Sequence, residues 1–258
     1  MKNENYRKQI DSIQYDNDFE EKTLNILSAE RQHGGYHMTG LAKRIIIIAA
    51  AAVILCLTAA ASIMFLSASN AAEFIGDEKL AKAFEEDGAV KVSETIKTGG
   101  YDITLLVLVS GKGLSDTYDT ASDKTYAVIS VAASDGTPYT NEDYPSLAFT
   151  PLISGLNPWQ FNAWTLHGGY TQFCEGGILY YLFDCDGISC FADRTVYFAV
   201  YDGFTPSREF FNIAKDGSIS FSKDFDKAAA LFTLPLDKSL ADKDAAQRLI
   251  EENDIPVV

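Results

Sequence analysis

The chain has 258 residues and a formal net charge of −15, with 36 acidic and 21 basic side chains. This surplus of acid argues against binding to nucleic acid, whose phosphates attract basic surfaces, and against docking onto anionic membranes or acidic polymers. Only three histidines and four cysteines are present, so the residues that most often carry catalysis or hold transition metals are scarce.

Residues 1–44 are predicted to hold two short amphipathic helices. The apolar positions of their two stripes are Tyr6, Ile10, Ile13, Phe19, Ile26 and Leu27. Their spacing is helical, and the acidic and amide side chains of residues 16–18 suit the start of the second helix. Such a short segment has too little apolar surface for a core of its own, so we expect a partner to cover it. The alternative is a partly disordered tail in which the helices form only transiently.

Residues 45–66 contain no charged side chain, proline or glycine. At a rise of about 1.5 Å per residue this stretch extends about 33 Å as a helix, enough to cross the core of a bilayer. Lys43 and Arg44 abut its N-terminal end, whereas no basic residue follows it until Lys79. The positive-inside rule therefore predicts a single-pass plasma-membrane protein with a cytoplasmic N-terminus and an extracellular C-terminal domain. A cleaved signal peptide is the alternative, but the leading segment and the apolar run are both too long for one.

After the span, residues 67–90 are predicted to form a stalk helix and a linker. Phe74, Ile75, Leu80 and Phe84 are spaced near a period of 3.6 within residues 73–86, and Gly88 follows the expected end of the helix. Acidic and basic residues balance in the cytoplasmic segment and the span has none, so the exported part carries the whole net charge.

From residue 91 the pattern changes to the period of two that is typical of strands. The predicted strands are residues 101–109, 125–133, 178–185, 195–201 and 208–213. Asp-Gly pairs beginning at residues 135, 186, 202 and 216 supply turn signals between them. Without alternating long helices, this pattern favours a mainly β, antiparallel, β-sandwich-like exported domain over residues 91–258, closed by a helix at residues 241–253.

Residues 137–171 show no regular pattern and contain both tryptophans, Trp159 and Trp164. A loop of this length in a compact domain is usually either functional or disordered. We expect it to pack on the sheets as an ordered lid or crossover.

No catalytic motif in the chain is complete. His167 has no Gly-x-Ser-x-Gly elbow to pair with, and Ser220 and Lys223 fall on opposite faces of a strand. We therefore predict no catalytic residue and no enzymatic activity.

Metal ligation and disulfide pairing are weakly encoded as well. Asp184, Asp186 and Gly187 resemble the start of a calcium loop, but the glutamate that should end such a loop is absent, and a hairpin turn explains the same residues. Cys185 and Cys190 can either face one another across a hairpin or remain as free buried thiols. We predict no metal site and no cofactor.

The layout of the chain resembles a family of membrane-anchored regulators from low-GC Gram-positive bacteria. The resemblance rests on the segments YRKQIDSI at residues 6–13 and DFEEKTL at residues 18–24, followed by a positively flanked span and an exported β domain. Members are often encoded beside extracytoplasmic-function sigma factors and are described as anti-sigma-like. The zinc-binding His-x-x-x-Cys-x-x-Cys signature of the best-defined anti-sigma factors has no counterpart, because residues 1–44 contain no cysteine. The resemblance thus implies a zinc-free helical clamp and an exported domain of uncharacterised ligand.

The leading hypothesis is a non-enzymatic signalling regulator. Residues 1–32 would hold a sigma factor through their apolar stripes, residues 45–66 would cross the lipid bilayer, and the exported domain would sense an unknown envelope ligand. The alternative is a surface-anchored extracellular binding or structural module with no transcriptional role. Neither hypothesis includes direct binding to nucleic acid.

Overall fold

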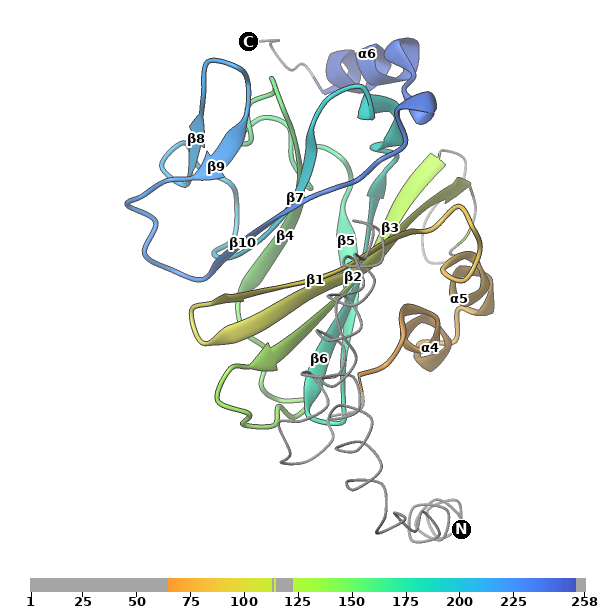
Figure 1. Ribbon diagram of the computed structural model, residues 1–258, viewed down its shortest axis with the longest axis vertical. Coiled ribbons are helices and arrows are strands. Elements are labelled where there is room, and N and C mark those ends of the chain that lie inside the picture. The colour runs from red at the N-terminus through yellow and green to blue at the C-terminus, as the bar shows by residue number, and fades with distance from the viewer. Residues whose placement is uncertain (1–64, 113, 115–122, 254–258) are drawn as a thin grey trace, which may run out of the picture. The chain divides into compact units, whose positions relative to one another are not determined.

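The computed structural model describes residues 65–112, 114 and 123–253. These residues form two main antiparallel sheets and a small two-stranded sheet (Figure 1). The five-stranded sheet consists, in spatial order, of β1 (Val90–Thr98), β2 (Tyr101–Lys112), β3 (Asp123–Ala133), β6 (Ile178–Asp186) and β5 (Gly169–Glu175). The other two sheets are β10 (Ala229–Thr233), β7 (Val196–Asp202) and β4 (Leu147–Ile153), and β8 (Phe211–Ile213) with β9 (Ile219–Phe221). This arrangement confirms the prediction of a mainly β, antiparallel domain.

The predicted cytoplasmic segment at residues 1–44 and residues 45–64 of the predicted span lie outside the described residues. The last two residues of the predicted span, Phe65 and Leu66, are not helical, and the Leu66 amide is hydrogen-bonded to Tyr180 of the β domain. The predicted end of the span at residue 66 is therefore wrong. Within the part of the chain that the structure describes, no helix combines the length and the apolar character needed to cross a membrane.

Four of the five predicted strands are confirmed, as β2, β3, β6 and β7, with small differences at their ends. The prediction for residues 208–213 is too long, because β8 begins only at Phe211. The strands β1, β4, β5, β9 and β10 are additional to the prediction. Two of them, β1 and β5, join their neighbours through Gly-Gly pairs with positive φ, Gly99-Gly100 and Gly176-Gly177. Such pairs suit tight hairpin turns, because glycine enters this region without steric cost.

The main core lies between the five-stranded and the three-stranded sheets. Ile129 and Phe183 reach it from the first sheet, and Phe149 and Phe198 reach it from the second. The rings of Phe183 and Phe198 meet edge to face with their centroids 5.2 Å apart. The two sheets therefore pack face to face over one shared apolar cluster.

The prediction of a single stalk helix over residues 73–86 is wrong. Two short helices, α4 (Ala68–Phe74) and α5 (Glu78–Ala83), occupy this region, and Gly76 with a φ of 85° separates them. The side chains of Ser67 and Asp77 cap them by accepting backbone hydrogen bonds.

Both helices pack on the outer face of the five-stranded sheet. Leu80 and Phe84 are buried there in a second apolar cluster, together with Val128 and Tyr180 from the sheet. At the start of α4 the Leu66 amide donates a hydrogen bond of 2.8 Å to the Tyr180 hydroxyl. The segment is therefore a layer of the β domain rather than a spacer outside it.

The hairpin β8–β9 covers the outer face of the three-stranded sheet. Tyr201 of β7 is fully buried there, and the rings of Phe210, Phe211, Phe221 and Phe225 surround it edge to face. Each face of both main sheets is consequently packed against another part of the domain.

The C-terminal helix α6 (Lys243–Glu252) confirms the helix predicted at residues 241–253. Asp242 caps it, and Ala246 and Ile250 join the main core. Two 3₁₀ helices, η1 (Ser189–Phe191) and η2 (Lys238–Leu240), complete the regular structure of the described residues.

The stretch at residues 137–171 is ordered, as expected, but it is not irregular throughout, because it contains β4 and the start of β5. The prediction missed β4 since Pro151 interrupts its apolar run, and proline argues against a strand unless the strand is an edge. β4 is in fact an edge of its sheet.

A matched pair of substitutions tests the packing of the β1–β2 hairpin. At Gly99 an added Cβ would lie 2.5 Å from Ala228 Cβ, whereas at Gly100 it would meet nothing within 4 Å. Both glycines have positive φ. We expect Gly100→Ala to lower the free energy of unfolding by about 1 kcal/mol and Gly99→Ala by roughly 2–4 kcal/mol, measured by urea unfolding. Equal losses would contradict the close approach of the hairpin to Ala228.

Candidate functional site

A cleft of about 280 Å³ opens at one side of the domain, where β4 and β5 form edges of the two main sheets. Its walls are the start of these two strands, the loop before β5 and the segment after β7. Its lining residues are Ser146, Leu147, Ala148, Phe149, Ala163, Trp164, Gly168, Gly169, Tyr170, Phe183, Gly203 and Phe204. This volume is near the lower end of the range for small-molecule sites, about 300–1,000 Å³.

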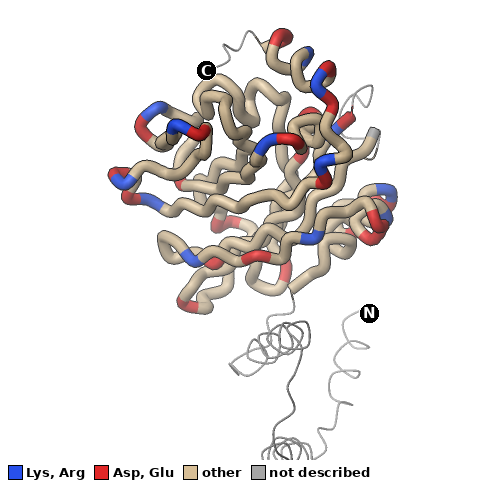
Figure 2. Tube along the Cα trace, turned by 45° about the horizontal axis from the view of Figure 1, so that its top comes forward, with Lys and Arg blue, Asp and Glu red and all other residues tan. Residues whose placement is uncertain are grey.

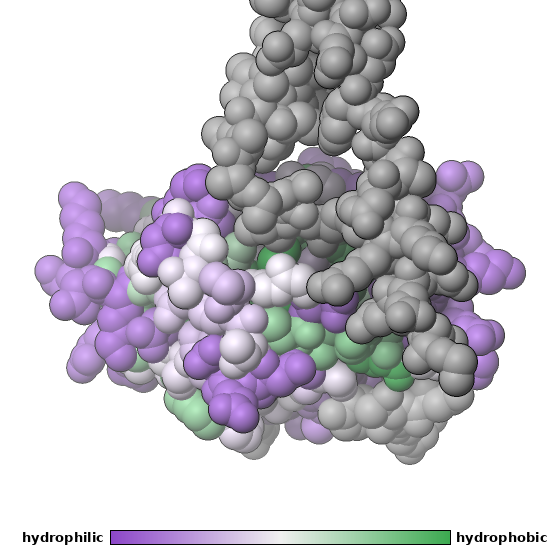
Figure 3. Space-filling model, turned by 90° about the horizontal axis from the view of Figure 1, so that it is seen from below, coloured by the Kyte–Doolittle hydropathy of each residue, from purple (hydrophilic) through white to green (hydrophobic). Residues whose placement is uncertain are grey.

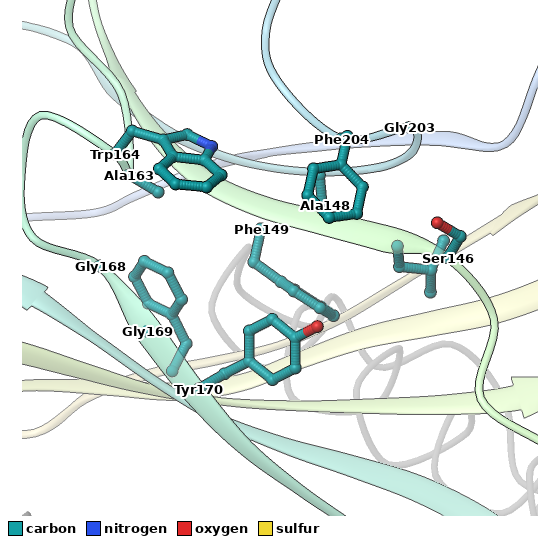
Figure 4. A pocket seen from close by; sticks show the side chains of 12 residues that line it. Ser146, Ala148, Phe149, Ala163, Trp164, Gly168, Gly169, Tyr170, Gly203 and Phe204 are labelled. Atoms are coloured by element: carbon teal, nitrogen blue, oxygen red, sulfur yellow. The ribbon is translucent and has the colours of Figure 1, made fainter. Parts of the chain in front are cut away.

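Three aromatic side chains of the cleft are unusually exposed. Trp164 is 64 % exposed, Tyr170 46 % and Phe204 75 %. Figure 4 shows their rings around one open space, with Phe149 between them. Large apolar side chains grouped in this way mark surfaces that bind a partner or ligand, because burial on binding removes them from water.

The walls of the cleft are held by packing and by hydrogen bonds. The Phe149 ring meets Tyr170 edge to face at 5.2 Å and contacts the buried Tyr181 at 4.6 Å. In the loop before β5, the Trp164 amide donates to Asn162 Oδ1 at 2.9 Å and the Ala163 amide donates to Thr150 Oγ1 at 2.8 Å. The loop is thereby fixed to β4 before any ligand arrives.

One glycine is required where this loop returns to β5. A Cβ on Gly168 would lie 2.9 Å from the Ala163 carbonyl oxygen and 3.2 Å from the Phe183 ring. The preceding residue, His167, has a φ of 48°. The chain thus turns sharply beneath Trp164, and a larger residue at position 168 would push the loop away from the floor of the cleft.

The lining carries no carboxylate, ammonium or guanidinium group. Charged residues lie elsewhere along the chain, where acidic and basic residues are interspersed (Figure 2). On the face seen in Figure 3, apolar surface is visible near the centre, with hydrophilic residues beside it. The cleft is therefore an uncharged, aromatic site on a strongly acidic domain, and rings and backbone groups dominate its chemistry.

A buried cluster of charged side chains lies at the C-terminal end of β6. Lys124 Nζ is 3.3 Å from Asp186 Oδ1 and 3.9 Å from Asp184 Oδ2, and all three side chains are largely buried. His167 Nδ1 lies 2.7 Å from Asp186 Oδ2. Burial raises the pKa of Asp184 to about 6; Lys124 opposes this rise and Asp186 adds to it. The cluster ties β3, β6 and the loop before β5 together beside the cleft.

The predicted partner-binding residues Tyr6, Ile10, Ile13, Phe19, Ile26 and Leu27, and the topology-determining Lys43 and Arg44, lie outside the described residues. The three described cysteines, including Cys185 and Cys190, are free thiols, which resolves the alternative that the sequence leaves open. Among the described residues no group of three or more His, Cys, Asp and Glu side chains is arranged to hold a metal ion. Asp186 belongs to the buried cluster rather than to a hairpin turn.

The exposed rings of the cleft are functional candidates that the sequence-based prediction missed. The only sequence signal was the presence of both tryptophans in residues 137–171. The structure separates their roles, because Trp164 lines the cleft whereas Trp159 stacks with Arg208. The Arg208 Cζ atom lies over the Trp159 ring, 5.2 Å from the ring centroid. Tyr170 and Phe204 give no signal of their own, because aromatic residues in strands and loops usually belong to the core.

The raised pKa of Asp184 predicts how stability depends on pH. Between about pH 4 and pH 6 the folded protein keeps a proton that the unfolded chain releases, so the free energy of unfolding falls as pH rises through this window. Asp184→Asn should flatten this dependence and stabilise the protein by about 1–2 kcal/mol at pH 7.5, with little change at pH 4. Urea unfolding at both pH values measures this, with the exposed Asp193→Asn as the control. A loss of stability at pH 7.5 would mean that Lys124 requires an ionised Asp184.

Comparison with known proteins adds no relative. No protein-family model, curated protein or solved structure matches this chain.

Proposed function

We propose that the chain is a non-enzymatic, single-pass membrane signalling regulator of the anti-sigma-like type. In this proposal the β domain lies outside the cell and binds an envelope ligand, residues 45–64 cross the bilayer, and residues 1–32 sequester a sigma factor in the cytoplasm. The observation that carries the sensing role is the aromatic cleft between β4 and β5.

The chemistry of the cleft supports ligand binding. Three exposed rings converge on a space of about 280 Å³ whose loop wall is already hydrogen-bonded in place. Binding would bury these rings without first ordering the loop, so little of the gain would be lost to conformational entropy. Grouped exposed aromatic side chains of this kind mark ligand-binding grooves and interaction sites.

The start of the domain supports a connection between the cleft and the membrane. The proposed span ends at residue 64, and two residues later the Leu66 amide donates a hydrogen bond to the Tyr180 hydroxyl in β6. β6 pairs with β5, whose residue Tyr170 lines the cleft. A shift of β5 on ligand binding would thus pass through one neighbouring strand to Leu66, two residues after the proposed end of the span.

The cytoplasmic end of the mechanism rests on the apolar stripes of residues 1–32. Burial of these side chains against a sigma factor would hold it away from its other partners, and a change transmitted through the span would alter this contact. The cleft equally supports the second candidate, a surface-anchored extracellular binding module. The two candidates differ in whether residues 1–44 hold a partner.

Topology can be tested with single cysteines in a chain that lacks its native ones. Glu20→Cys should resist an impermeant thiol reagent in intact cells, whereas Asp116→Cys should react, because the positive-inside rule puts residue 20 in the cytoplasm. Permeabilised cells provide the control, since both positions should then be labelled. The reverse pattern in intact cells would overturn the proposed orientation.

The cytoplasmic clamp can be tested by charge substitution in both stripes. Each large apolar truncation should cost on the order of 2–4 kcal/mol of binding, as hot-spot residues do. Ile10→Asp combined with Leu27→Asp should therefore release the sigma factor and raise transcription of its target genes. Gln14→Ala, outside the stripes, should change neither. A pull-down with residues 1–44 that retrieves no sigma factor, together with unchanged transcription, would favour the anchored binding module.

A further inference from the structure

The outer edge of β5 borders the cleft and has free backbone groups. In an antiparallel pair, residues alternate between those whose N–H and C=O face the neighbouring strand and those whose groups face away. The Cys174 amide donates to Asn141 Oδ1 at 3.0 Å, so it faces away from β6. Because the direction alternates along the strand, the backbone N–H and C=O groups of Gln172 and Tyr170 also face away from β6. Within the described residues no hydrogen bond to these outward groups is found.

The register of the β5–β6 hairpin shows independently which residues of β5 face away from β6. Glu175 and Ile178 flank the two-residue Gly176-Gly177 turn, so they form a hydrogen-bonded pair. Counting back by two along β5, the inward-facing residues are Phe173, Thr171 and Gly169. The residues between them therefore present their amides and carbonyls to solvent.

The other edges of the two main sheets, β1, β4 and β10, are protected against pairing, whereas β5 is open from Gly169 to Phe173 and is covered by Asn141 only at Cys174. β1 has a bulge after Lys91 and alternating charges, and β4 has Pro151 at a position where an N–H would otherwise face outward. β10 contacts β1, and its Ala229 amide donates to Thr98 Oγ1. From Gly169 to Cys174, β5 has no charge, proline or bulge.

The free edge and the aromatic cleft are parts of one surface. Tyr170 lines the cleft (Figure 4), and its N–H and C=O face outward on the free edge of β5. A residue paired opposite Tyr170 would project its side chain to the same face, and thus toward Phe149, Trp164 and Phe204. An added strand would therefore have both a ladder to pair with and a hollow for one side chain.

We propose that β5 accepts an extended peptide segment of another protein as an additional strand, with a large apolar side chain of that segment in the cleft. This inference rests on the proposed sensing function and names the class of its ligand. The domain is strongly acidic, so charge complementarity favours a segment with basic residues beside the apolar one. Strand addition supplies affinity through main-chain hydrogen bonds and specificity through the side-chain pocket.

The free groups fit a peptide better than a sugar. Tyr170 and Gln172 lie two residues apart along a straight edge, which is the repeat of a strand rather than the spacing of hydroxyls on a ring. Besides its rings, the cleft offers only the Ser146 and Tyr170 hydroxyls and the Trp164 N–H as polar side-chain groups. A glycan would leave most of its hydroxyls without partners there.

The test uses the full chain in phospholipid nanodiscs and a phage-displayed pool of random peptides of about ten residues, long enough for one strand. Selected peptides should share an apolar residue flanked by basic ones. Gln172→Pro removes one outward N–H without breaking the β5–β6 ladder, and should weaken their binding by about ten-fold or more. Gln172→Ala keeps the backbone and should bind normally. N-methylation of alternate amides on the peptide should abolish binding to the unaltered protein, a result that does not depend on how any variant folds.

The cleft is tested with Phe204→Ala, since this side chain is almost fully exposed and its removal spares the core. It should weaken peptide binding by about ten-fold, whereas Leu240→Ala, at another exposed apolar side chain away from the cleft, should not.

A pool without binders, or N-methylated peptides that bind equally well, would overturn strand addition. Self-association of the nanodisc-bound chain that Gln172→Pro removes would assign the edge to a second copy instead. If peptides bind but residues 1–44 hold no sigma factor, strand addition stands and the proposed signalling role is refuted. If Phe204→Ala alters target transcription but no peptide binds, the signalling role stands and strand addition is refuted.

Discussion

The five-stranded sheet is covered on both faces, and this constraint determines where the domain can be open. The three-stranded sheet packs on one face, and α4 with α5 packs on the other. Since both faces are used for packing, only the edges of the sheets are left for contact with a ligand. The aromatic cleft lies between two such edges, so the site that we propose for ligand binding follows from how the sheets are covered.

The same constraint explains which strands the sequence predicts well. β6 is buried along almost its whole length and reads as an apolar run rich in tyrosine and phenylalanine, which identifies it clearly. β1 and β5 are edges, so water remains in contact with many of their residues and their sequences are correspondingly polar. Edge strands therefore lose the pattern that sequence-based prediction uses, although their Gly-Gly turns are a signal that could have found them.

The helical layer and the cleft depend on information that local patterns lack. A period of 3.6 over residues 73–86 identifies the buried Leu80 and Phe84, but it does not report that Phe74 is half exposed or that Gly76 turns the chain between two helices. The rings of Trp164, Tyr170 and Phe204 come from a loop, a strand and another loop, and they meet only because the two sheet edges do. The apolar stripes of residues 1–32 stay a prediction from the sequence.

The way in which the chain joins the domain has a mechanical consequence. The Leu66 amide is bonded to a tyrosine within the five-stranded sheet, and Phe74 at the end of α4 stacks on Phe173 with a centroid distance of 4.3 Å. Tension applied at residue 65 would act on this one hydrogen bond and one short helix before it reached the strand ladders. Helix α4 is then the element that yields first, so a stretched tether would lengthen by peeling α4 away while the sheets and the cleft keep their shape.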